Sequence, residues 1–363
     1  MKKIAIIGIV GLPASYGGFE TLAENLVKHH FVEGLKDKIT IYCSSKKTPI
    51  KSPLYLSAKL SYVPLDANGV QSILYDICSM VLAIWNRNEV ILTLGVSGAI
   101  AIPFLRLFSS VKFITNIDGM EWRRKKWGLL AKHYLRYSEK IAIKYSHEVI
   151  SDNEAIADYV MEVYGIKTNV ISYGGDQFSN VESKDISFLD IPSNYSYSVC
   201  RIEPDNNIHL ILNAFSKMES QALVIVGNWD KNDYGKNLRK LYGNFSNLFL
   251  LDPIYDLGML KSLRSNAQMY IHGHAAGGTN PSLVEAMHFG KAVLAFDCTF
   301  NRNTTEEKAL YFSDEVGIFR TFENIELIQC EKIGEELLDI ANRKYTWSLI
   351  SQQYFDVMGL FTN

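Results

Sequence analysis

A glycine-rich loop followed by a helix start is the segment best suited to hold a charged ligand. Residues 272–287 have the sequence "HGHAAGGTNPSLVEAM". The pair Gly277 and Gly278 lets the backbone approach a ligand without an intervening Cβ, and Asn280 before Pro281 is typical of a helix start. The first-turn amides are then expected to be free and to suit a phosphate, namely those of Ser282, Leu283 and Val284. An ordinary loop that needs glycine for tight packing is the alternative.

Three further side chains follow apolar runs, where the ligand-binding residues of α/β proteins lie. Asp118 follows "KFITNI" and is expected either to orient an incoming hydroxyl group or to act as a turn residue. Arg201 follows "YSVC" and is expected to bind an anion, with a surface arginine as the alternative. Tyr255 lies in "LLDPIYD" and is expected either to stack on a nucleotide base or to be a plain turn tyrosine.

The sequence predicts no metal site and no cofactor. His272 and His274 bracket a glycine, but no third ligand has a suitable spacing, so His272 is expected to pack at a strand end. No two aspartates stand two residues apart, and an Asp-x-Asp metal clamp is therefore missing from the sequence. Charge on a bound anion would be met by Arg201 and by helix dipoles.

Composition indicates a globular enzyme of two domains. The 363 residues exceed the usual size of a single core. With 37 basic and 39 acidic residues, no global charge favours nucleic acid. The five cysteines form no CxxC and are expected to be reduced core residues of a cytosolic protein. "MKKIAIIGIVG" is expected to be a first strand and not a signal peptide. The longest uncharged run, 90–105, is shorter than the ~18 to 20 residues that span a bilayer.

Apolar strand patterns alternate with helical patterns twice along the chain, which predicts two Rossmann-like domains with parallel sheets. The polar stretch "DQFSNVESKDISFLDIPSNY" interrupts the alternation and is expected to link them. We therefore predict domains at 1–176 and 177–345 that face a central cleft. A C-terminal helix within 346–363, from about Ser348 to Phe361, is expected to return to the first domain.

The helix "NPSLVEAMHFGKAVLAFD" resembles the donor-nucleotide helix of glycosyltransferase family 4, which has the GT-B fold. The segments "GIVGLPASYGGFETLAENL", "ITNIDGMEWRRKKW" and "RIEPDNNIHLILNAF" occur in the order of a bacterial subgroup that includes rhamnosyltransferases of polysaccharide synthesis. The resemblance implies a retaining, metal-independent transferase that uses a nucleotide sugar. It favours dTDP-L-rhamnose as the donor and a glycan or a lipid-diphosphate-linked glycan as the acceptor.

The same resemblance assigns roles to individual residues. Glu285 matches the glutamate that holds the ribose hydroxyls, whereas Gly277 stands where relatives carry a glutamate that contacts the transferred sugar. Arg201 matches one of two diphosphate-binding cations, and Asn206 replaces the second. His274 is expected to occupy the space of the missing glutamate. Further donor contacts are expected at positions 17, 18 and 279, which are Gly17, Gly18 and Thr279.

A basic and aromatic segment covers 121–145, with eight Lys and Arg against two Glu. Such a segment either lies on an anionic membrane surface or is a solvated helix face. The residues expected to contact membrane or acceptor are Trp122, Arg123, Arg124, Lys125, Lys126 and Trp127. The protein is accordingly expected in the cytoplasm, with peripheral contact to the inner face of the cell membrane.

Three alternatives to this function remain open. The first is a family 4 transferase with another donor, such as a UDP- or GDP-hexose. The second is a non-catalytic relative that binds sugar nucleotides. The third is a nucleotide-dependent oxidoreductase, which the spacing of the N-terminal glycines disfavours because it does not give G-x-G-x-x-G.

Overall fold

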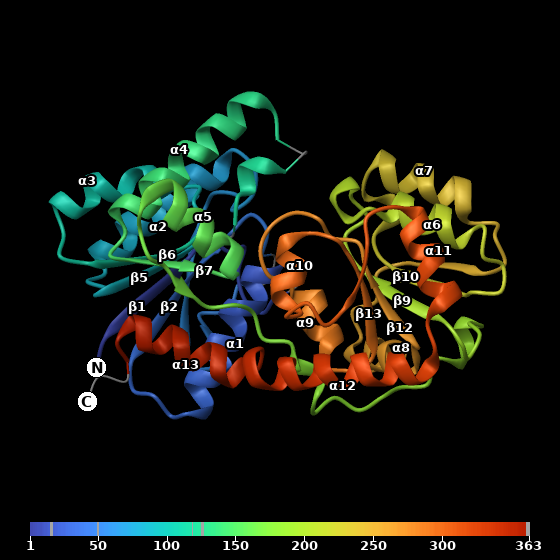
Figure 1. Cartoon of the computed structure of the whole chain (residues 1–363). Coiled ribbons are helices and arrows are strands. Elements are labelled where there is room, and N and C mark those ends of the chain that lie inside the picture. The colour runs from blue at the N-terminus through green and yellow to red at the C-terminus, as the bar shows by residue number, and fades with distance from the viewer. Residues whose placement is uncertain (15–16, 49–50, 118, 125–126, 361–363) are drawn as a thin grey trace. The chain divides into compact units, whose positions relative to one another are not determined.

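The computed structural model describes residues 1–14, 17–48, 51–117, 119–124 and 127–360 (Figure 1). The chain divides into two compact units. Unit 1 comprises Met1–Tyr173 and Trp347–Asn363, and unit 2 comprises Gly174–Thr346.

The described part of unit 1 is built on an eight-stranded sheet with the order β3-β4-β2-β1-β5-β6-β7-β8. Its central strands are apolar on both faces because helices cover both, and β5 is buried along its whole length. Only β3 runs antiparallel to its neighbour among these strands. The strands are β1 (Lys3–Ile7), β2 (Lys38–Ser44), β3 (Leu54–Tyr55), β4 (Ala58–Val63), β5 (Val90–Leu94), β6 (Lys112–Asn116), β7 (Glu148–Ser151) and β8 (Asn169–Val170).

Helices lie on both faces of this sheet, with α2 to α5 on one face and α1 and α13 on the other (Figure 1). The helices are α1 (Gly18–Val32), α2 (Gln71–Trp85), α3 (Ile102–Leu107), α4 (Leu129–Tyr145), α5 (Glu154–Tyr164) and α13 (Trp347–Met358). Short 3-10 helices cover Ala99–Ala101 and Glu121–Arg123. The C-terminal helix α13 packs against α1, and the side-chain amide of Asn116 donates to the hydroxyl of Tyr354 at 2.6 Å.

Unit 2 has a six-stranded parallel sheet with the order β11-β10-β9-β12-β13-β14. Figure 1 shows α6, α7 and α11 on one face and α8, α9 and α12 on the other. The strands are β9 (Ser196–Val199), β10 (Leu223–Val226), β11 (Leu248–Leu251), β12 (Met269–His272), β13 (Ala292–Phe296) and β14 (Leu310–Phe312). The helices are α6 (Ile208–Phe215), α7 (Asp233–Tyr242), α8 (Leu257–Asn266), α9 (Pro281–Met287), α10 (Thr299–Thr304), α11 (Glu315–Asn324) and α12 (Leu327–Lys344). Short 3-10 helices cover Asp176–Phe178, Ser187–Leu189, Pro204–Asn206 and Trp229–Lys231.

The polar stretch at 176–195, expected to be a link, packs on α8 as part of unit 2. The hydroxyl of Ser262 donates to the carbonyl of Lys184 at 2.6 Å. The ammonium of Lys261 donates to the carbonyl of Val181 at 2.7 Å. Phe178 of this segment is buried, so the segment also contributes to the core of unit 2.

Candidate functional site

Two loops of unit 2 meet where the strand order of its sheet reverses. Strands β9 and β12 are neighbours, and the chain moves away from them in opposite directions along the sheet. Ligands of open α/β sheets bind outside the carboxyl ends of the strands at such a point. The loop after β9 contains Arg201 to Asn207, and the loop after β12 contains Gly273 to Asn280. The sequence-predicted donor residues of unit 2 therefore cluster on these two loops, except Tyr255, Glu285 and the start of α9.

Hydrogen bonds tie the two loops together. The amide of Ala275 donates to the carbonyl of Asp205 at 3.0 Å, and the side chain of Asn207 donates to the carbonyl of Gly273 at 2.9 Å. A Cβ at Gly273 would lie 2.1 Å from the carbonyl oxygen of Asn206. Glycine is thus required at this position for the close approach of the two backbones.

Asn206 is a structural bridge between these loops. Its side chain is buried, its Nδ2 donates to the carbonyl of Arg201 at 2.6 Å, and its Oδ1 lies 2.7 Å from Nδ1 of His274. Both polar atoms of the Asn206 side chain are therefore engaged inside the unit. These contacts give Asn206 a bracing role and hold His274 in place. The expected donor contact of Asn206 stays a prediction.

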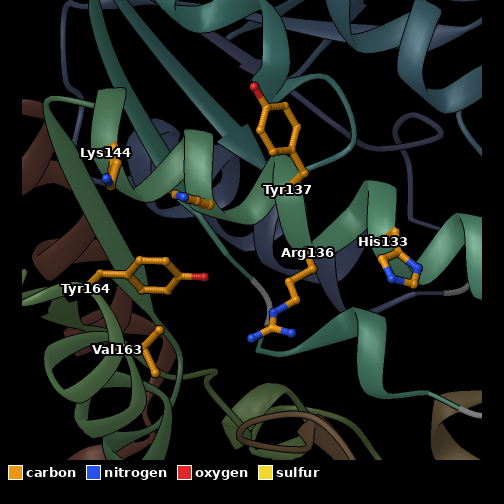
Figure 2. A pocket seen from close by; sticks show the side chains of 7 residues that line it. His133, Arg136, Tyr137, Lys144, Val163 and Tyr164 are labelled. Atoms are coloured by element: carbon orange, nitrogen blue, oxygen red, sulfur yellow. The ribbon is translucent and has the colours of Figure 1, made fainter.

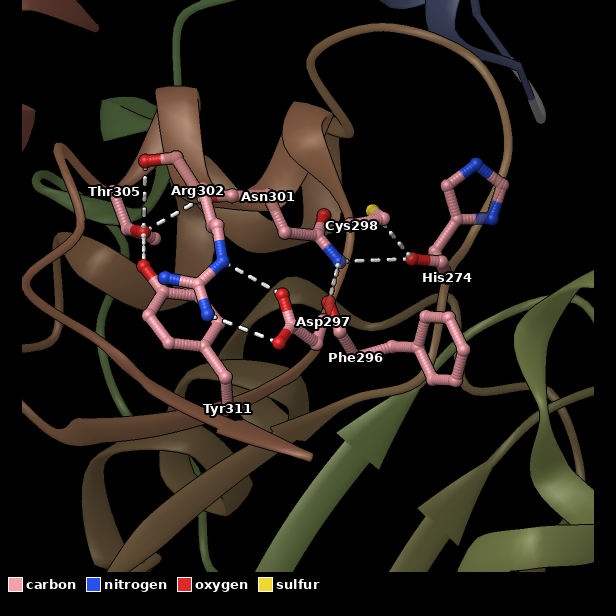
Figure 3. Close-up of polar contacts among 8 residues, drawn as sticks. All are labelled: His274, Phe296, Asp297, Cys298, Asn301, Arg302, Thr305 and Tyr311. Atoms are coloured by element: carbon pink, nitrogen blue, oxygen red, sulfur yellow. Dashed lines mark hydrogen bonds and ion pairs between the residues drawn. The ribbon is translucent and has the colours of Figure 1, made fainter. Parts of the chain in front are cut away.

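The loop after β13 supports the same site from the side. Figure 3 shows the side-chain amide of Asn301, on α10, donating to the carbonyls of His274 and Phe296, at 2.9 and 2.8 Å. Nearby, Arg302 forms a two-pronged pair with Asp297 and lies over the ring of Tyr311, 4.3 Å from its centroid. The two bonds from Asn301 fix the backbone of His274 relative to the end of β13.

Arg201 is the cation that the loop after β9 offers to a ligand. Its side chain is half-buried, and its guanidinium makes no ion pair or hydrogen bond with any residue that the structure describes. A guanidinium is a planar fork of donors that suits phosphate oxygens. The position is therefore chemically fit for the predicted anion contact.

The glycine pair after β12 has the backbone geometry that its composition predicts. Gly277 has a φ of 96°, a conformation that side-chain-bearing residues rarely adopt. A residue with a side chain at position 277 would therefore be strained. Within the described ranges, the backbone amides of Gly277 and Gly278 have no hydrogen-bond partner. Thr279, between them and Asn280, is buried.

The expectation of free amides at the start of α9 is wrong. The side chain of Asn280 caps the helix as predicted, and its Oδ1 accepts from the amide of Ser282 at 3.0 Å. The carbonyl of Asn280 accepts from Leu283 and Val284, at 3.0 and 3.3 Å. The cap that begins the helix thus consumes the amides that an anion would need. The available amides lie earlier, at the glycine pair.

Glu285 lies in a buried network that the sequence does not predict. Its Oε2 pairs with Nη2 of Arg264 at 2.5 Å, and its Oε1 accepts from the side chain of Gln177 at 2.5 Å. Burial raises the pKa of Glu285, and the charge of Arg264 and the hydrogen bond from Gln177 oppose that rise. A carboxylate has about four lone-pair sites. Arg264 and Gln177 use two of them, so Glu285 can still accept hydrogen bonds from two ribose hydroxyls. The ribose contact of Glu285 therefore stays a prediction.

Arg264 is the functional candidate that sequence reasoning missed. It is buried, with its guanidinium 4.4 Å from the ring centroid of Phe178 and 6.0 Å from that of Phe289. Its Nε and Nη1 atoms have no hydrogen-bond partner in the described part of the chain. Nothing in the local sequence "LKSLRSNA" indicates that Arg264 is buried, because Phe178 and Phe289 come from distant segments.

His272 packs at the end of β12, as the sequence predicts. Its ring stacks on that of Tyr270, with centroids 5.9 Å apart, and its Nε2 has no partner among the described residues. Burial lowers the pKa of His272 to about 3.

Because the pKa of His272 is lowered in the folded chain, the free energy of unfolding is expected to fall at acidic pH. The unfolded chain gains the His272 proton below about pH 6.5, whereas the folded chain gains it only near 3, so stability falls as pH falls between those values. Between pH 7 and 5 the loss from this residue is about 2 kcal/mol. Urea unfolding at both pH values is expected to show a smaller loss for His272→Leu than for the natural chain. Equal pH dependence of the two proteins would contradict the prediction.

The remaining predicted residues occupy other environments. Tyr255 is exposed after the edge strand β11. In unit 1, Gly17 and Gly18 lie at the start of α1, where Glu20 folds back so that its carboxylate lies against Gly17 and accepts from the amide of Val10 at 3.0 Å. The predicted diphosphate contact of Gly17 and Gly18 stays a prediction.

The predicted membrane or acceptor residues of unit 1 are held by contacts within the unit. Trp122 donates to Glu139 at 3.1 Å, and Trp127 donates to Glu121 at 3.0 Å. Arg124 pairs with Glu121 at 2.8 Å, while Arg123 is exposed and lies 5.2 Å from the ring centroid of Trp122. The predicted residues Asp118, Lys125 and Lys126 lie outside the described residues.

Two further expectations concern metals and membranes. Over residues 1–14, 17–48, 51–117, 119–124 and 127–360, no group of three or more His, Cys, Asp or Glu side chains is arranged to hold a metal ion. In the same ranges, no helix combines the length and the apolar character that crossing a bilayer requires.

Two family models match the chain. Residues 1–176 match a family described as a domain of unknown function, DUF1972, and residues 181–315 match the family described as glycosyl transferases group 1. No curated protein sequence matches the chain significantly.

Solved structures of low sequence identity resemble the whole chain. Sucrose-phosphate synthase from Thermosynechococcus elongatus is 15% identical with a TM-score of 0.83, and the match covers 99% of this chain and 98% of that one. HepE of Anabaena, in complex with UDP-glucose, is 14% identical with a TM-score of 0.75 and 99% coverage of both chains. A glycosyltransferase from Rickettsia africae is 14% identical with a TM-score of 0.71, covering 100% and 99%. The predicted fold class, GT-B with two parallel-sheet α/β domains, is confirmed.

Proposed function

Because the chain is a glycosyltransferase with the GT-B fold, we propose that it transfers a sugar from a nucleoside-diphosphate donor to a hydroxyl of a glycan or lipid-linked glycan. The observation that carries the proposal is the half-buried guanidinium of Arg201, unpaired among the described residues. It lies on the loop after β9, which is hydrogen-bonded to the loop that carries the glycine pair after β12. A cation and bare amides at a strand-order reversal suit a diphosphate.

The proposed chemistry is mostly electrostatic. The bond between the anomeric carbon and the diphosphate oxygen breaks, a bond to the acceptor oxygen forms on the same face, and the acceptor proton passes to the departing diphosphate. Arg201 and the amides of Gly277 and Gly278 stabilise the charge that develops on the diphosphate. Retention of configuration follows from the resemblance of the segment at 280–297 to family 4. No metal is assigned to this reaction.

Glu285 is proposed to accept hydrogen bonds from the ribose of the donor. Its carboxylate is positioned for this by Arg264 and Gln177, which hold one oxygen each. His274 is proposed to face the sugar, because Gly277 leaves the glutamate side chain of the relatives missing. Peripheral contact with an anionic membrane stays a prediction, which vesicle flotation would test.

The donor is proposed to be dTDP-L-rhamnose, on the resemblance to the rhamnosyltransferase subgroup and the glycine at position 277. Among dTDP-, UDP- and GDP-sugars, dTDP-L-rhamnose is expected to raise the Tm most, because a ligand that binds only the folded state stabilises it. A thermal-shift panel checks this. HepE of Anabaena binds UDP-glucose, so UDP-glucose is the informative competitor. A clear preference for UDP-glucose would overturn the rhamnose assignment, and no shift with any sugar nucleotide would overturn the donor class.

A further inference from the structure

Unit 1 contains a second site of a different kind, a concave pocket between α4 and α5. Its volume is about 510 Å³, which is within the range of small-ligand pockets. Figure 2 shows side chains from both helices around it. Arg136, Lys140 and Lys144 line it from α4, and Tyr164 lines it from the end of α5.

The cations of this pocket form a single row. Arg136, Lys140 and Lys144 are spaced by four residues and therefore share one face of α4, and Lys132 precedes them by one more turn. The sequence of α4 contains one acid, Glu139, and that side chain is buried. Like charges at this spacing destabilise a helix. A bound anion would relieve this repulsion between the cations of the row.

The ammonium groups of this row are available to a ligand. Lys140 and Lys144 are exposed and make no ion pair or hydrogen bond with any part of the chain that the structure describes. Arg136 is also exposed, and its guanidinium lies 5.0 Å from the ring centroid of Trp122. This stacking orients the guanidinium.

A buried carboxylate shapes the wall of the pocket without consuming these cations. Glu139 accepts from the hydroxyls of Tyr159 and Tyr164, at 2.9 and 3.3 Å, and from the indole of Trp122 at 3.1 Å. Three neutral donors therefore satisfy Glu139. The same contacts hold Tyr164 at the pocket and Trp122 beside Arg136.

We propose that this pocket binds a phosphate group, as a phosphomonoester or a diphosphate. Three cations on one helix face, one of them an oriented guanidinium, match the charge and the acceptor oxygens of such a group. Either a soluble phosphorylated molecule or a lipid headgroup presents this chemistry. Leu129 and Leu130 are strongly exposed at the start of the same helix, which favours the headgroup. The proposal does not rest on the donor reaction, because binding alone tests it.

The test removes the row and leaves the rest of unit 1 unchanged. The variant Arg136→Gln/Lys140→Ala/Lys144→Ala is compared with a matched control of equal charge change, Lys36→Ala/Lys38→Ala/Lys59→Ala, whose lysines are exposed elsewhere in unit 1. The probes are glycerol 1-phosphate in calorimetry, and vesicles of phosphatidylcholine with and without phosphatidic acid in sedimentation. The pocket variant is expected to lose about tenfold or more in affinity, because it removes three cations that would contact the phosphate, while the control changes less than about twofold.

The two probes also separate the sources of the phosphate. Binding of glycerol 1-phosphate that the pocket variant loses identifies a soluble phosphate ester. Binding only to phosphatidic acid vesicles, again lost in the variant, identifies a lipid headgroup. Equal binding of the natural chain and the variant to both probes, or binding to neither, overturns the proposal. Lys140→Gln/Lys144→Gln, which keeps Arg136 on Trp122, repeats the test if the triple variant fails to fold.

Discussion

Arg201→Ala is expected to lower kcat by about 100-fold or more, because removing one donor aimed at developing charge costs about 3 kcal/mol. The guanidinium of Arg201 has no ion-pair or hydrogen-bond partner among the described residues that its loss would leave unpaired, so the fold is expected to survive. Initial rates at saturating donor, with the Tm of each protein, provide the measurement. The kcat of Arg201→Lys is expected to lie between those of the natural chain and Arg201→Ala, because lysine keeps the charge but lacks the planar fork of donors.

The matched control for this experiment is Arg239→Ala. Arg239 lies on α7 of the same unit and pairs with Asp230 and Asp252 at the surface. Surface pairs contribute at most about 1 kcal/mol, and nothing places this arginine at the donor loops. Its rate is expected to equal that of the natural chain. Near-native turnover of Arg201→Ala would remove the proposed role of Arg201.

Arg264→Leu is expected to destabilise unit 2 by about 3–5 kcal/mol, because it leaves a buried carboxylate without its charged partner. Arg264 and Glu285 are both largely shielded from water, with side chains 4% and 15% exposed. Hydrogen exchange of the segments that form α8, β12 and α9 measures the effect locally, which matters because two units need not unfold together.

A double replacement distinguishes the contribution of the Arg264–Glu285 pair from the cost of leaving one partner buried and unpaired. Arg264→Leu/Glu285→Leu is expected to recover most of the lost stability, since replacing both partners of a buried pair by apolar residues is often neutral. The double variant is also expected to bind donor poorly, because Glu285 is the proposed ribose acceptor. If Arg264→Leu were as stable as the natural chain, the pair would not hold α9 against the segment at 176–178.

The alternating apolar patterns were sufficient to predict two parallel α/β domains, because strands covered on both faces must be apolar throughout. The cap at Asn280 and the burial of His272 were equally local signals. The prediction of free amides at Ser282 and Leu283 is wrong, because Asn280, which caps the helix, accepts the hydrogen bonds that these amides would otherwise donate to an anion. The burial of Arg264 was out of reach for another reason, because it depends on Phe178 and Phe289, which only the tertiary fold brings near. The basic character of 121–145 was visible in the sequence, but the pocket that its lysines form with Tyr164 was not.

The contact between Gly273 and the backbone of Asn206 has a consequence for engineering. Because there is no space for even a methyl group at Gly273, the backbones of segments 201–207 and 273–280 pack closely, and the conformation of each depends on that of the other. A chimaera that imports one segment from a different transferase would bring in a mismatched neighbour. Specificity grafts in this protein must therefore exchange both segments in a single step.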